Sequence, residues 1–172
     1  MSIELMCDQF DQKEPFDDIY YLSYGSNLNQ EQMKNRCSDA RVLGKVIMPG
    51  FRLIFRGVAD FCQDKNSDLC LGVWKISRND EERLDEYEGV RGGLYRKIYW
   101  TMSINSKKIP ALIYQMNRSN INLPADSYLE TIKNGFEDFR FDLNFLEESL
   151  VYTKKNTKGN SYIKKSNRRK QL

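Results

Sequence analysis

Hydrophobic and polar positions alternate along this chain in short runs. Residues typical of turns lie between these runs. Six runs have the alternating or apolar pattern typical of β-strands. They cover residues 19–24, 41–48, 51–57, 69–76, 94–104 and 109–116. Pro49-Gly50 predicts a turn between the second and third run, and Asn105-Ser106-Lys107 predicts a hairpin between the last two.

Four other segments have the spacing of amphipathic helices, at residues 29–36, 77–87, 126–139 and 143–152. The helix that ends at Tyr87 would be capped by Ser77 or by Asn79, with acids in its first turn, and Gly89 would break it. Many strands with scattered helices, and few long crossovers, predict an α+β domain built around a small curved sheet or barrel.

The chain has 172 residues, which is the size of one domain with a full core. Its body is predicted at residues 19–152. Residues 1–18 are acidic with little periodicity, which predicts a flexible N-terminal arm. Residues 153–172 hold eight Lys or Arg and no acid, which is typical of a disordered basic tail that is either a solvated extension or a contact for nucleic acid or another anionic surface.

Composition limits the possible chemistry. The chain has no histidine, so a general base would have to be a carboxylate, Lys, Tyr or Cys. Its four cysteines show no C-x-x-C spacing, which favours free thiols in a reducing compartment. With no apolar run of membrane-spanning length and no signal-peptide pattern, the chain is expected to be soluble and cytoplasmic.

Residues 20–28 read Tyr-Tyr-Leu-Ser-Tyr-Gly-Ser-Asn-Leu, a strand that enters a turn at the start of a helix. Such a junction exposes several N–H groups in one place and favours an anion or a developing oxyanion. Gly25 allows close backbone approach, and Asn27 or Asn29 can cap the helix. An ordinary strand–turn–helix junction would give the same pattern.

Residues 84–90 read Leu-Asp-Glu-Tyr-Glu-Gly-Val. The acids Asp80, Glu82, Asp85 and Glu86 are expected on the solvent side of the helix. Glu88 lies at the helix end, where the dipole disfavours a carboxylate, and aromatic walls there would raise its pKa and suit it to act as a base. A solvated surface acid is the alternative.

Together these two segments, followed by Gly93-Leu94-Tyr95, resemble the γ-glutamylcyclotransferase family, in which a Tyr-Gly-Ser-Asn loop forms the substrate cradle and the Glu of an L-D-x-x-E-G segment is the acid/base. The resemblance runs from about residue 20 to about residue 150. One departure concerns Phe136 and Phe139-Arg140-Phe141, which stand where the family has a small residue and a Gly-Leu-Pro turn. That departure leaves undecided which residues form the far wall of the pocket, and so which substrate the pocket selects.

The resemblance implies a γ-glutamylcyclotransferase-like fold, a small mixed β-barrel with flanking helices. It implies release of 5-oxoproline from a γ-glutamyl compound, as in glutathione metabolism, by an enzyme of the carbon–nitrogen lyase or acyltransferase type with no metal or organic cofactor. Glu88 would be catalytic. The residues that would bind substrate are Tyr21, Leu22, Ser23, Tyr24, Gly25, Ser26, Asn27, Tyr95, Tyr114 and Tyr128.

Other interpretations remain open at this point. A non-catalytic module on the same fold would bind a small anion and recruit nucleic acid or a protein through the basic tail. Phe51, Phe55 and Phe61 with Arg52 and Arg56 mix aromatic and basic types as a nucleic-acid face does, although the acidic body argues against one. For an enzyme, the substrate is open: a γ-glutamyl amino acid, a γ-glutamyl amine or isopeptide, glutathione, or a γ-glutamyl protecting group on a biosynthetic intermediate. The choice between monomer and homodimer is open too.

Overall fold

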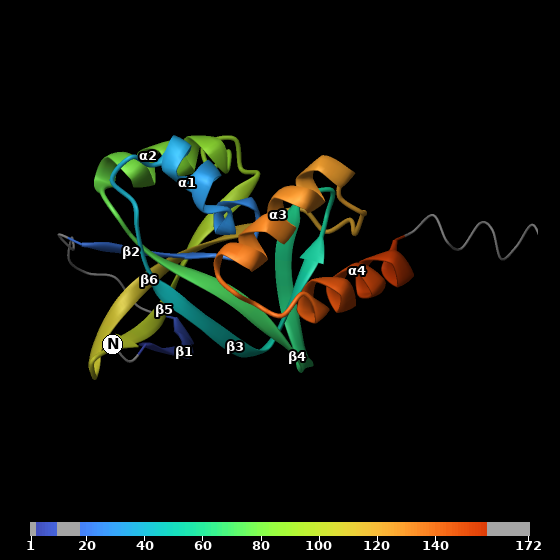
Figure 1. Ribbon diagram of the computed structural model, residues 1–172, viewed down its shortest axis with the longest axis horizontal. Helices are drawn as coiled ribbons and strands as arrows, with labels where there is room; N and C mark the ends of the chain where they lie inside the picture. Colours follow the sequence, from blue (N-terminus) through green and yellow to red (C-terminus); the bar gives the residue numbers. More distant parts are fainter. Residues whose placement is uncertain (1–2, 10–17, 158–172) are drawn as a thin grey trace, which may run out of the picture.

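The computed structural model describes residues 3–9 and 18–157. Six strands, four α-helices and one short 3-10 helix, η1, make up this part of the chain (Figure 1). In chain order they are β1 (Ile3–Gln9), β2 (Ile19–Ser23), η1 (Ser26–Leu28), α1 (Gln30–Arg36), β3 (Arg41–Phe55), β4 (Ala59–Ile76), α2 (Arg78–Tyr87), β5 (Tyr95–Ile104), β6 (Lys107–Met116), α3 (Asp126–Asp138) and α4 (Asn144–Asn156).

All six strands belong to one sheet in the order β1-β5-β6-β2-β4-β3. Only β2 and β6 pair in parallel; the other neighbours are antiparallel. The edge strands β1 and β3 approach each other, since a Cβ on Gly44 would lie 3.4 Å from Cδ1 of Ile3. The sheet is therefore a nearly closed barrel, and the predicted α+β class with a small mixed barrel is confirmed.

The helices lie in two groups around the barrel. In Figure 1, α1 and α2 sit together at one end of the sheet, while α3 and α4 lie beside the long β3–β4 hairpin. No helix in the described part of the chain is both long and apolar enough to cross a membrane.

Pro49-Gly50 does not end a strand. β3 runs through it and carries a bulge between Pro49 and Phe51, with Gly50 at φ +81°. A bulge tolerates a proline and a left-handed glycine inside a continuing edge strand. The chain turns instead at Gly57, where φ is +85° and the N–H of Arg56 donates to the carbonyl of Val58. β4 therefore starts ten residues before the predicted strand at 69–76.

The predicted flexible arm is wrong for residues 3–9, which form β1 and pair with β5. Backbone hydrogen bonds to an exposed sheet edge need no hydrophobic periodicity, so the sequence pattern carried no sign of this strand. At the other end α4 continues to Asn156, beyond the predicted boundary at 152. The rest of the predicted arm and most of the basic tail lie outside the described residues.

The core contains both tryptophans and the aromatic residues that departed from the family pattern. Trp74 and Trp100 are buried. Phe139 packs edge-on against Trp74 at a centroid distance of 5.7 Å, and Phe136 and Phe141 are buried beside it. These phenylalanines therefore fill the space under α3 and do not form a pocket wall.

Cys37, Cys62 and Cys70 are free thiols, as predicted. Burial raises the pKa of Cys37 and of Cys70 to about 12, so both stay protonated at neutral pH and behave as core residues.

Candidate active site

Strand β2 delivers the Tyr-Gly-Ser-Asn segment to the end of the barrel that α1 and α2 cover. Directly after β2, η1 is closed by hydrogen bonds from the N–H of Leu28 to the carbonyl of Gly25 and from the N–H of Asn29 to the carbonyl of Ser26. Asn29, not Asn27, caps α1, because its Oδ1 accepts from the N–H of Gln32 at 2.9 Å. Asn27 therefore does not cap the helix, and it lines the pocket.

Two glycines let neighbouring elements approach this turn closely. A Cβ on Gly25 would lie 2.8 Å from the Cβ of Ala59 and 3.3 Å from the hydroxyl of Tyr128. A Cβ on Gly135 in α3 would lie 2.6 Å from the Cβ of Leu28. Real Cβ atoms do not come that close, so both positions need glycine for packing inside the protein. The turn is thus clamped between the start of β4 and α3.

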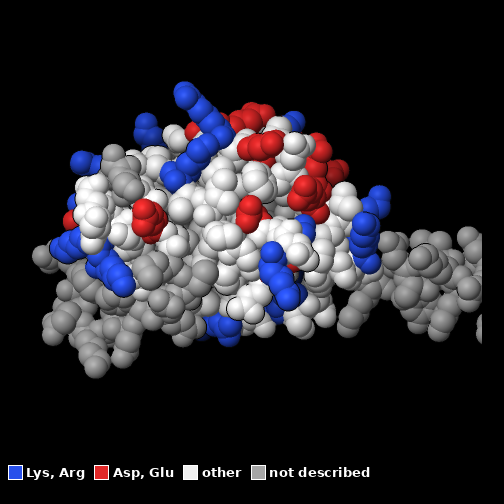
Figure 2. Space-filling view, turned by 90° about the horizontal axis from the view of Figure 1, so that it is seen from below, with Lys and Arg blue, Asp and Glu red and all other residues white. Residues whose placement is uncertain are grey.

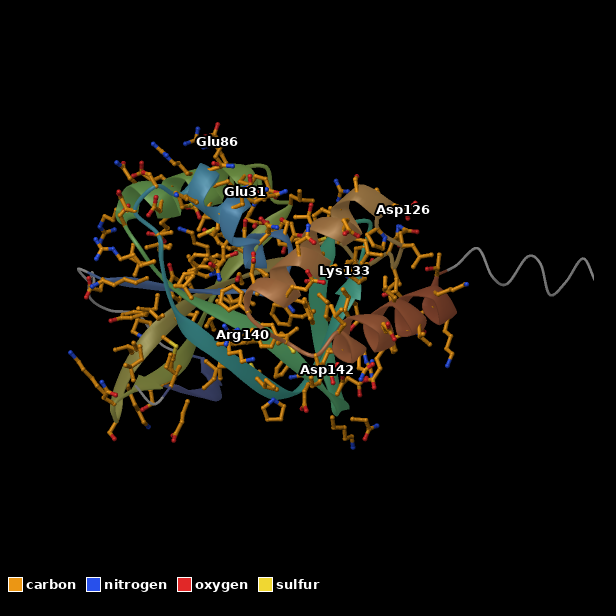
Figure 3. The ribbon with its side chains drawn as sticks, viewed as in Figure 1. Glu31, Glu86, Asp126, Lys133, Arg140 and Asp142 are labelled. Atoms are coloured by element: carbon orange, nitrogen blue, oxygen red, sulfur yellow. The ribbon has the colours of Figure 1, made fainter. Side chains whose placement is uncertain are left out.

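Helix α2 brings the second predicted segment to the same place. Ser77 caps it, and Ser77 and Asp80 form a reciprocal capping box. The helix ends at Tyr87, so Glu88 is its C-cap residue, and Gly89 follows with φ +63°. Glu86 is exposed on the outer side of α2 (Figure 3), whereas Glu88 turns inward.

The four acids expected on the solvent side of α2 do not share one environment. Glu82 and Glu86 are exposed. Asp80 is buried in the capping box, and Asp85 accepts hydrogen bonds from Tyr114 and Lys97. Asp85 thus ties α2 to strands β5 and β6 behind the pocket wall.

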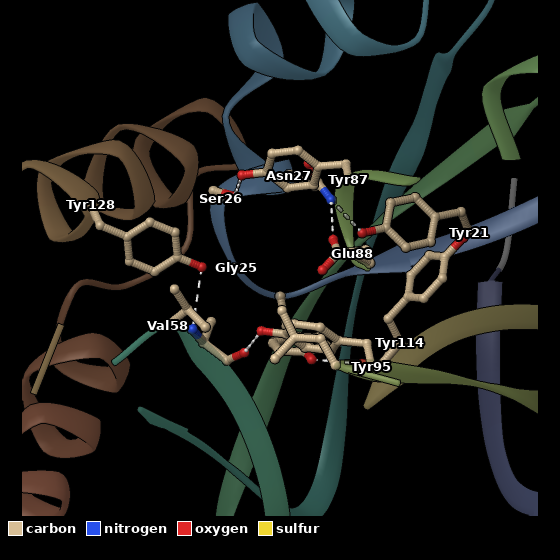
Figure 4. Close-up of a pocket in the computed structure, with 13 residues that line it drawn as sticks. Tyr21, Gly25, Ser26, Asn27, Val58, Tyr87, Glu88, Tyr95, Tyr114 and Tyr128 are labelled. Carbon is tan, nitrogen blue, oxygen red and sulfur yellow. Dashed lines mark hydrogen bonds between the residues drawn. The ribbon is translucent and has the colours of Figure 1, made fainter. Parts of the chain in front are cut away.

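The two segments meet at a cavity of about 220 Å³ (Figure 4). Nine of the eleven predicted site residues line it. The lining consists of Tyr21, Tyr24, Gly25, Ser26, Asn27, Val58, Ala59, Tyr87, Glu88, Leu94, Tyr95, Tyr114 and Tyr128.

Leu22 and Ser23 do not line this cavity. Leu22 is fully buried in the core, and the hydroxyl of Ser23 accepts a hydrogen bond from the indole of Trp74 at 2.9 Å. In strand β2 alternate side chains point to opposite faces, so Leu22 points away from the face that carries Tyr21. Ser23 is on the same face as Tyr21, but its hydroxyl is bonded to Trp74.

Among the residues that the structure describes, Glu88 is the only carboxylate in the lining. Burial raises its pKa to about 7, while the positive charge of Arg36 and a hydrogen bond from Asn27 Nδ2 to Oε1, at 2.9 Å, act in the opposite direction. A group that titrates near neutral pH can both accept and release a proton during a reaction. The environment of Glu88 therefore suits acid–base chemistry.

The tyrosine hydroxyls around the cavity divide into two kinds. Those of Tyr24, Tyr95 and Tyr114 donate to the carbonyls of Tyr114 and Ala59 and to the carboxylate of Asp85, at 2.6, 2.6 and 2.7 Å. Burial holds the pKa of each above its usual range, so they remain neutral. Their protons are committed within the protein, and their rings form the walls.

The other three hydroxyls accept hydrogen bonds from the protein. That of Tyr87 accepts from Arg36 at 2.8 Å and lies 3.2 Å from the Ser26 hydroxyl, with which it shares a hydrogen bond. Tyr21 accepts from the amide of Asn27 at 2.9 Å, and Tyr128 accepts from the N–H of Ala59 at 3.2 Å. A phenol that accepts one bond still has its own proton to donate. Tyr21 and Tyr128 therefore each keep a hydroxyl proton that the bonds from Asn27 and Ala59 do not use.

Sequence reasoning missed several members of the site. Val58 and Ala59 come from the β3–β4 turn, whose position the sequence did not reveal. Tyr87 directly precedes Glu88 and could have been suspected from that neighbourhood. Arg36 does not line the cavity but lies behind Asn27, and its place at the end of a short polar helix gave no signal.

The aromatic and basic side chains of β3 and β4 do not form a nucleic-acid face. Arg52 pairs with Asp64 and Arg56 with Asp60, while Phe55 and Phe61 are buried. On the face seen in Figure 2, Lys and Arg are scattered among acidic and uncharged side chains and form no single patch.

The sequence of this chain is also similar to the sequences of known proteins. The AIG2-like family matches residues 71–139. γ-Glutamylcyclotransferase of Bos taurus is 27% identical over 138 residues, covering 73% of this chain and 73% of that protein. The Homo sapiens γ-glutamylcyclotransferase is 26% identical over 141 residues, covering 74% and 75%.

Solved structures share the fold. A structure with the name γ-glutamyl cyclotransferase superposes with a TM-score of 0.67 at 24% identity, over 77% of this chain and 86% of that one. An uncharacterized human protein superposes with a TM-score of 0.68, over 78% and 87%. In sequence and in fold, this chain is similar to the γ-glutamylcyclotransferases, as the motifs around Tyr24 and Glu88 predicted.

Proposed function

We propose that this protein is a γ-glutamylcyclotransferase that releases 5-oxoproline from a γ-glutamyl amine, amino acid or peptide. The α-amino nitrogen of the glutamyl group attacks its own γ-carbonyl carbon. A lactam C–N bond forms, the original amide C–N bond breaks, and the leaving nitrogen takes up a proton. The reaction neither consumes water nor changes oxidation state, so it needs only proton transfer and positioning.

The observation that carries this proposal is that the carboxylate of Glu88 lies beside the Tyr-Gly-Ser-Asn turn in the lining of one small cavity. The substrate amine is protonated at neutral pH and must lose a proton before it can attack. With a pKa raised to about 7, Glu88 is basic enough to accept that proton and acidic enough to pass it to the leaving nitrogen. Asn27 occupies only Oε1, which leaves Oε2 for the substrate.

The turn supplies the complementary donors. The first N–H groups of a helical turn have no partner within it, and those around Gly25 and Ser26 belong to residues that line the cavity. They would hold the substrate carboxylate or the oxyanion that develops at the γ-carbonyl. Tyr21 and Tyr128 would add hydroxyl donors from opposite sides.

The cavity walls would contribute by holding the substrate in a folded conformation. Cyclisation requires the extended glutamyl chain to adopt the rotamer that brings amine and carbonyl together, and a fitted pocket can fix it before the reaction. Rings of Tyr95 and Tyr114 are buried and anchored by their hydroxyls, so they would form a rigid boundary for that conformation.

A pocket that only binds a small anion is the competing function. A carboxylate in the lining repels an anionic ligand, and burial makes that repulsion stronger. The Glu88 carboxylate would thus assist cyclisation, but it would weaken the binding of an anion. The pocket favours the enzyme.

The test is to incubate the protein with a panel of γ-glutamyl compounds and to detect 5-oxoproline by mass spectrometry. Glu88→Gln should lower the rate by about 10²–10⁴-fold, because a general base is lost while the amide still accepts the bond from Asn27. Glu86→Gln, an exposed acid on the same helix, is the matched control and should keep full activity. Near wild-type turnover by Glu88→Gln would refute the assignment, and a wild-type protein inactive on the whole panel would favour the binding module.

A further inference from the structure

Arg36 connects the three short elements that build one side of the pocket. Its Nη1 donates to Oδ1 of Asn27 in η1 at 2.7 Å. Its Nη2 donates to Gln32 in α1 at 2.6 Å and to the hydroxyl of Tyr87 in α2 at 2.8 Å. The guanidinium carbon also lies 3.8 Å from the centroid of the Tyr87 ring, so the side chain is held on several sides.

The bond from Arg36 decides which way the Asn27 amide faces. A guanidinium can only donate hydrogen bonds, so the Asn27 atom that faces it must be the carbonyl oxygen, Oδ1. The amide nitrogen is then forced to the other side, where it donates to Glu88 Oε1 and to the Tyr21 hydroxyl, both at 2.9 Å. A reversed amide would place its oxygen against the carboxylate and its nitrogen against the guanidinium, so Arg36 and Glu88 favour the same orientation of Asn27.

The charge of Arg36 faces Glu88 without a competitor. Apart from the neutral amide of Asn27, the other groups that interact with Glu88 come from the surrounding elements and are the tyrosines Tyr21, Tyr24, Tyr95, Tyr114 and Tyr128. Burial keeps these phenols neutral. Among the described residues, Arg36 is thus the one formal charge that acts on the Glu88 carboxylate, and it acts against the effect of burial.

We propose that Arg36 is the positioning residue of this site: its guanidinium orients the Asn27 amide toward Glu88 and supplies the positive charge that faces the carboxylate. Arg36 does not line the cavity, so it acts through Asn27 and Glu88 and not on the substrate. This inference rests on the proposed function for its consequence in catalysis, but the interaction itself can be measured without turnover.

A purely structural role is the alternative. Arg36 would then only fasten α1 to α2 by its contacts with Gln32 and Tyr87. Loss of the side chain would lower the stability of the fold and leave the titration of Glu88 where it was. The two roles therefore differ in a quantity that stability measurements do not report.

The first experiment titrates Glu88 by NMR. The carbon-13 signal of its carboxyl carbon is assigned by its loss in Glu88→Gln and followed from pH 4 to 9 in the wild type, in Arg36→Met and in Arg36→Lys. Methionine keeps an apolar stem without charge, whereas lysine keeps the charge without the planar fork. We expect the midpoint to rise by roughly one pH unit in Arg36→Met and to stay near the wild-type value in Arg36→Lys.

The second experiment measures kcat/KM against pH for the same proteins on a γ-glutamyl substrate. In Arg36→Met the acid limb should move upward with the NMR midpoint. In Arg36→Lys the limb should stay in place while the plateau falls, by about tenfold, because a single ammonium cannot hold both Asn27 and Gln32 as the fork does. Thermal melting of each variant gives the stability effect separately.

An unchanged Glu88 midpoint in Arg36→Met would overturn the proposal and leave Arg36 a structural residue. If Arg36→Met does not fold, Arg36→Gln replaces it, since glutamine is also neutral and can still donate to Asn27. A wild-type protein that makes no 5-oxoproline would refute the proposed function, while the NMR titration would still decide the role of Arg36.

Discussion

At the scale of single residues, position in the tertiary structure separates acids that the sequence makes look alike. Glu86 and Glu88 are two residues apart in one acidic segment. Glu86 is exposed on the outer side of α2, but Glu88 is the C-cap of that helix and faces a wall of tyrosines. Desolvation and the negative end of the helix dipole both disfavour its charge, and only Arg36 and Asn27 oppose them.

The raised pKa of Glu88 predicts a dependence of stability on pH. The pKa rises from 4.5 to about 7 on folding, so the folded protein binds a proton more tightly than the unfolded chain. Its contribution is full below pH 4.5 and is lost as the pH rises through 7. Relative to the wild type, Glu88→Gln should therefore gain stability between these values, by at most about 3 kcal/mol.

Urea unfolding of the wild type and Glu88→Gln at pH 5, 6, 7 and 8 checks this prediction. Glu86→Gln should show a constant difference from the wild type over the same range, since Glu86 is exposed. A constant difference for Glu88→Gln as well would mean that Glu88 titrates as an ordinary surface acid.

At the scale of elements, the pocket depends on short segments that packing fixes in place. η1 has only three residues and α1 only seven, too few to be stable alone. They are held by Asn29 as a cap, by Gly135 of α3 pressed against Leu28, and by the bonds of Arg36. α2 is better defined locally, because its capping box satisfies two N–H groups at its start.

The contact of α3 with η1 predicts that Gly135 cannot be enlarged. In Gly135→Ala the new Cβ would meet Leu28 Cβ at 2.6 Å and the nitrogen of Asn29 at 2.7 Å. Although alanine favours helices, this overlap should destabilise the fold by about 1–3 kcal/mol. The neighbouring Asn134→Ala, at an exposed position of the same helix, should be neutral or slightly stabilising. Urea midpoints of both variants give the comparison, and equal midpoints would contradict the close packing.

The cap of α2 gives a second prediction for an element. The Ser77 hydroxyl accepts from the N–H of Asp80 at 3.1 Å, so Ser77→Ala should cost about 1 kcal/mol. Asn79 was the other candidate cap, but it lies inside the helix and is exposed. Asn79→Ala is the control and should leave stability almost unchanged. A larger loss for Asn79→Ala than for Ser77→Ala, in thermal melting, would reverse this assignment.

At the scale of the whole molecule, the barrel and α4 set the limits of the folded unit. β1 closes the barrel from one side, and α4 packs along the β3–β4 hairpin (Figure 1). Near the end of α4, Thr153 is fully buried, and its hydroxyl accepts from the N–H of Phe55 at 3.3 Å. The folded unit therefore extends beyond residue 152, into what the charge pattern predicted as tail.

This boundary predicts where the chain can be shortened. Removing residues 158–172 keeps α4 whole and should leave kcat on a small γ-glutamyl substrate and thermal stability unchanged. Removing residues 153–172 also takes Thr153 and leaves the N–H of Phe55 without a partner, which should cost about 1–3 kcal/mol. Kinetics and melting of both truncations test this prediction. A large fall in kcat for the shorter deletion would mean that the basic segment contributes to the pocket.

The sequence by itself determined most of the elements and the two segments that meet at the site. Strong local signals account for this: alternation for the hairpin of β5 and β6, acids and a cap for α2, and a strand–turn–helix pattern before α1. The Tyr-Gly-Ser-Asn and Leu-Asp-x-x-Glu-Gly segments also carried the family resemblance, because such motifs are local and retain their order in the chain.

Only the tertiary structure decided the features that depend on contacts between distant segments. Strand β1 exists because a free sheet edge offers backbone partners, and β3 continues through Pro49 because a bulge accommodates it. Leu22 and Ser23 do not belong to the site, because Leu22 is buried in the core and the Ser23 hydroxyl is bonded to the indole of Trp74. Arg36 belongs to the site because α1 packs beside α2. Its guanidinium donates to Asn27, and Asn27 donates to the Glu88 carboxylate at the end of α2.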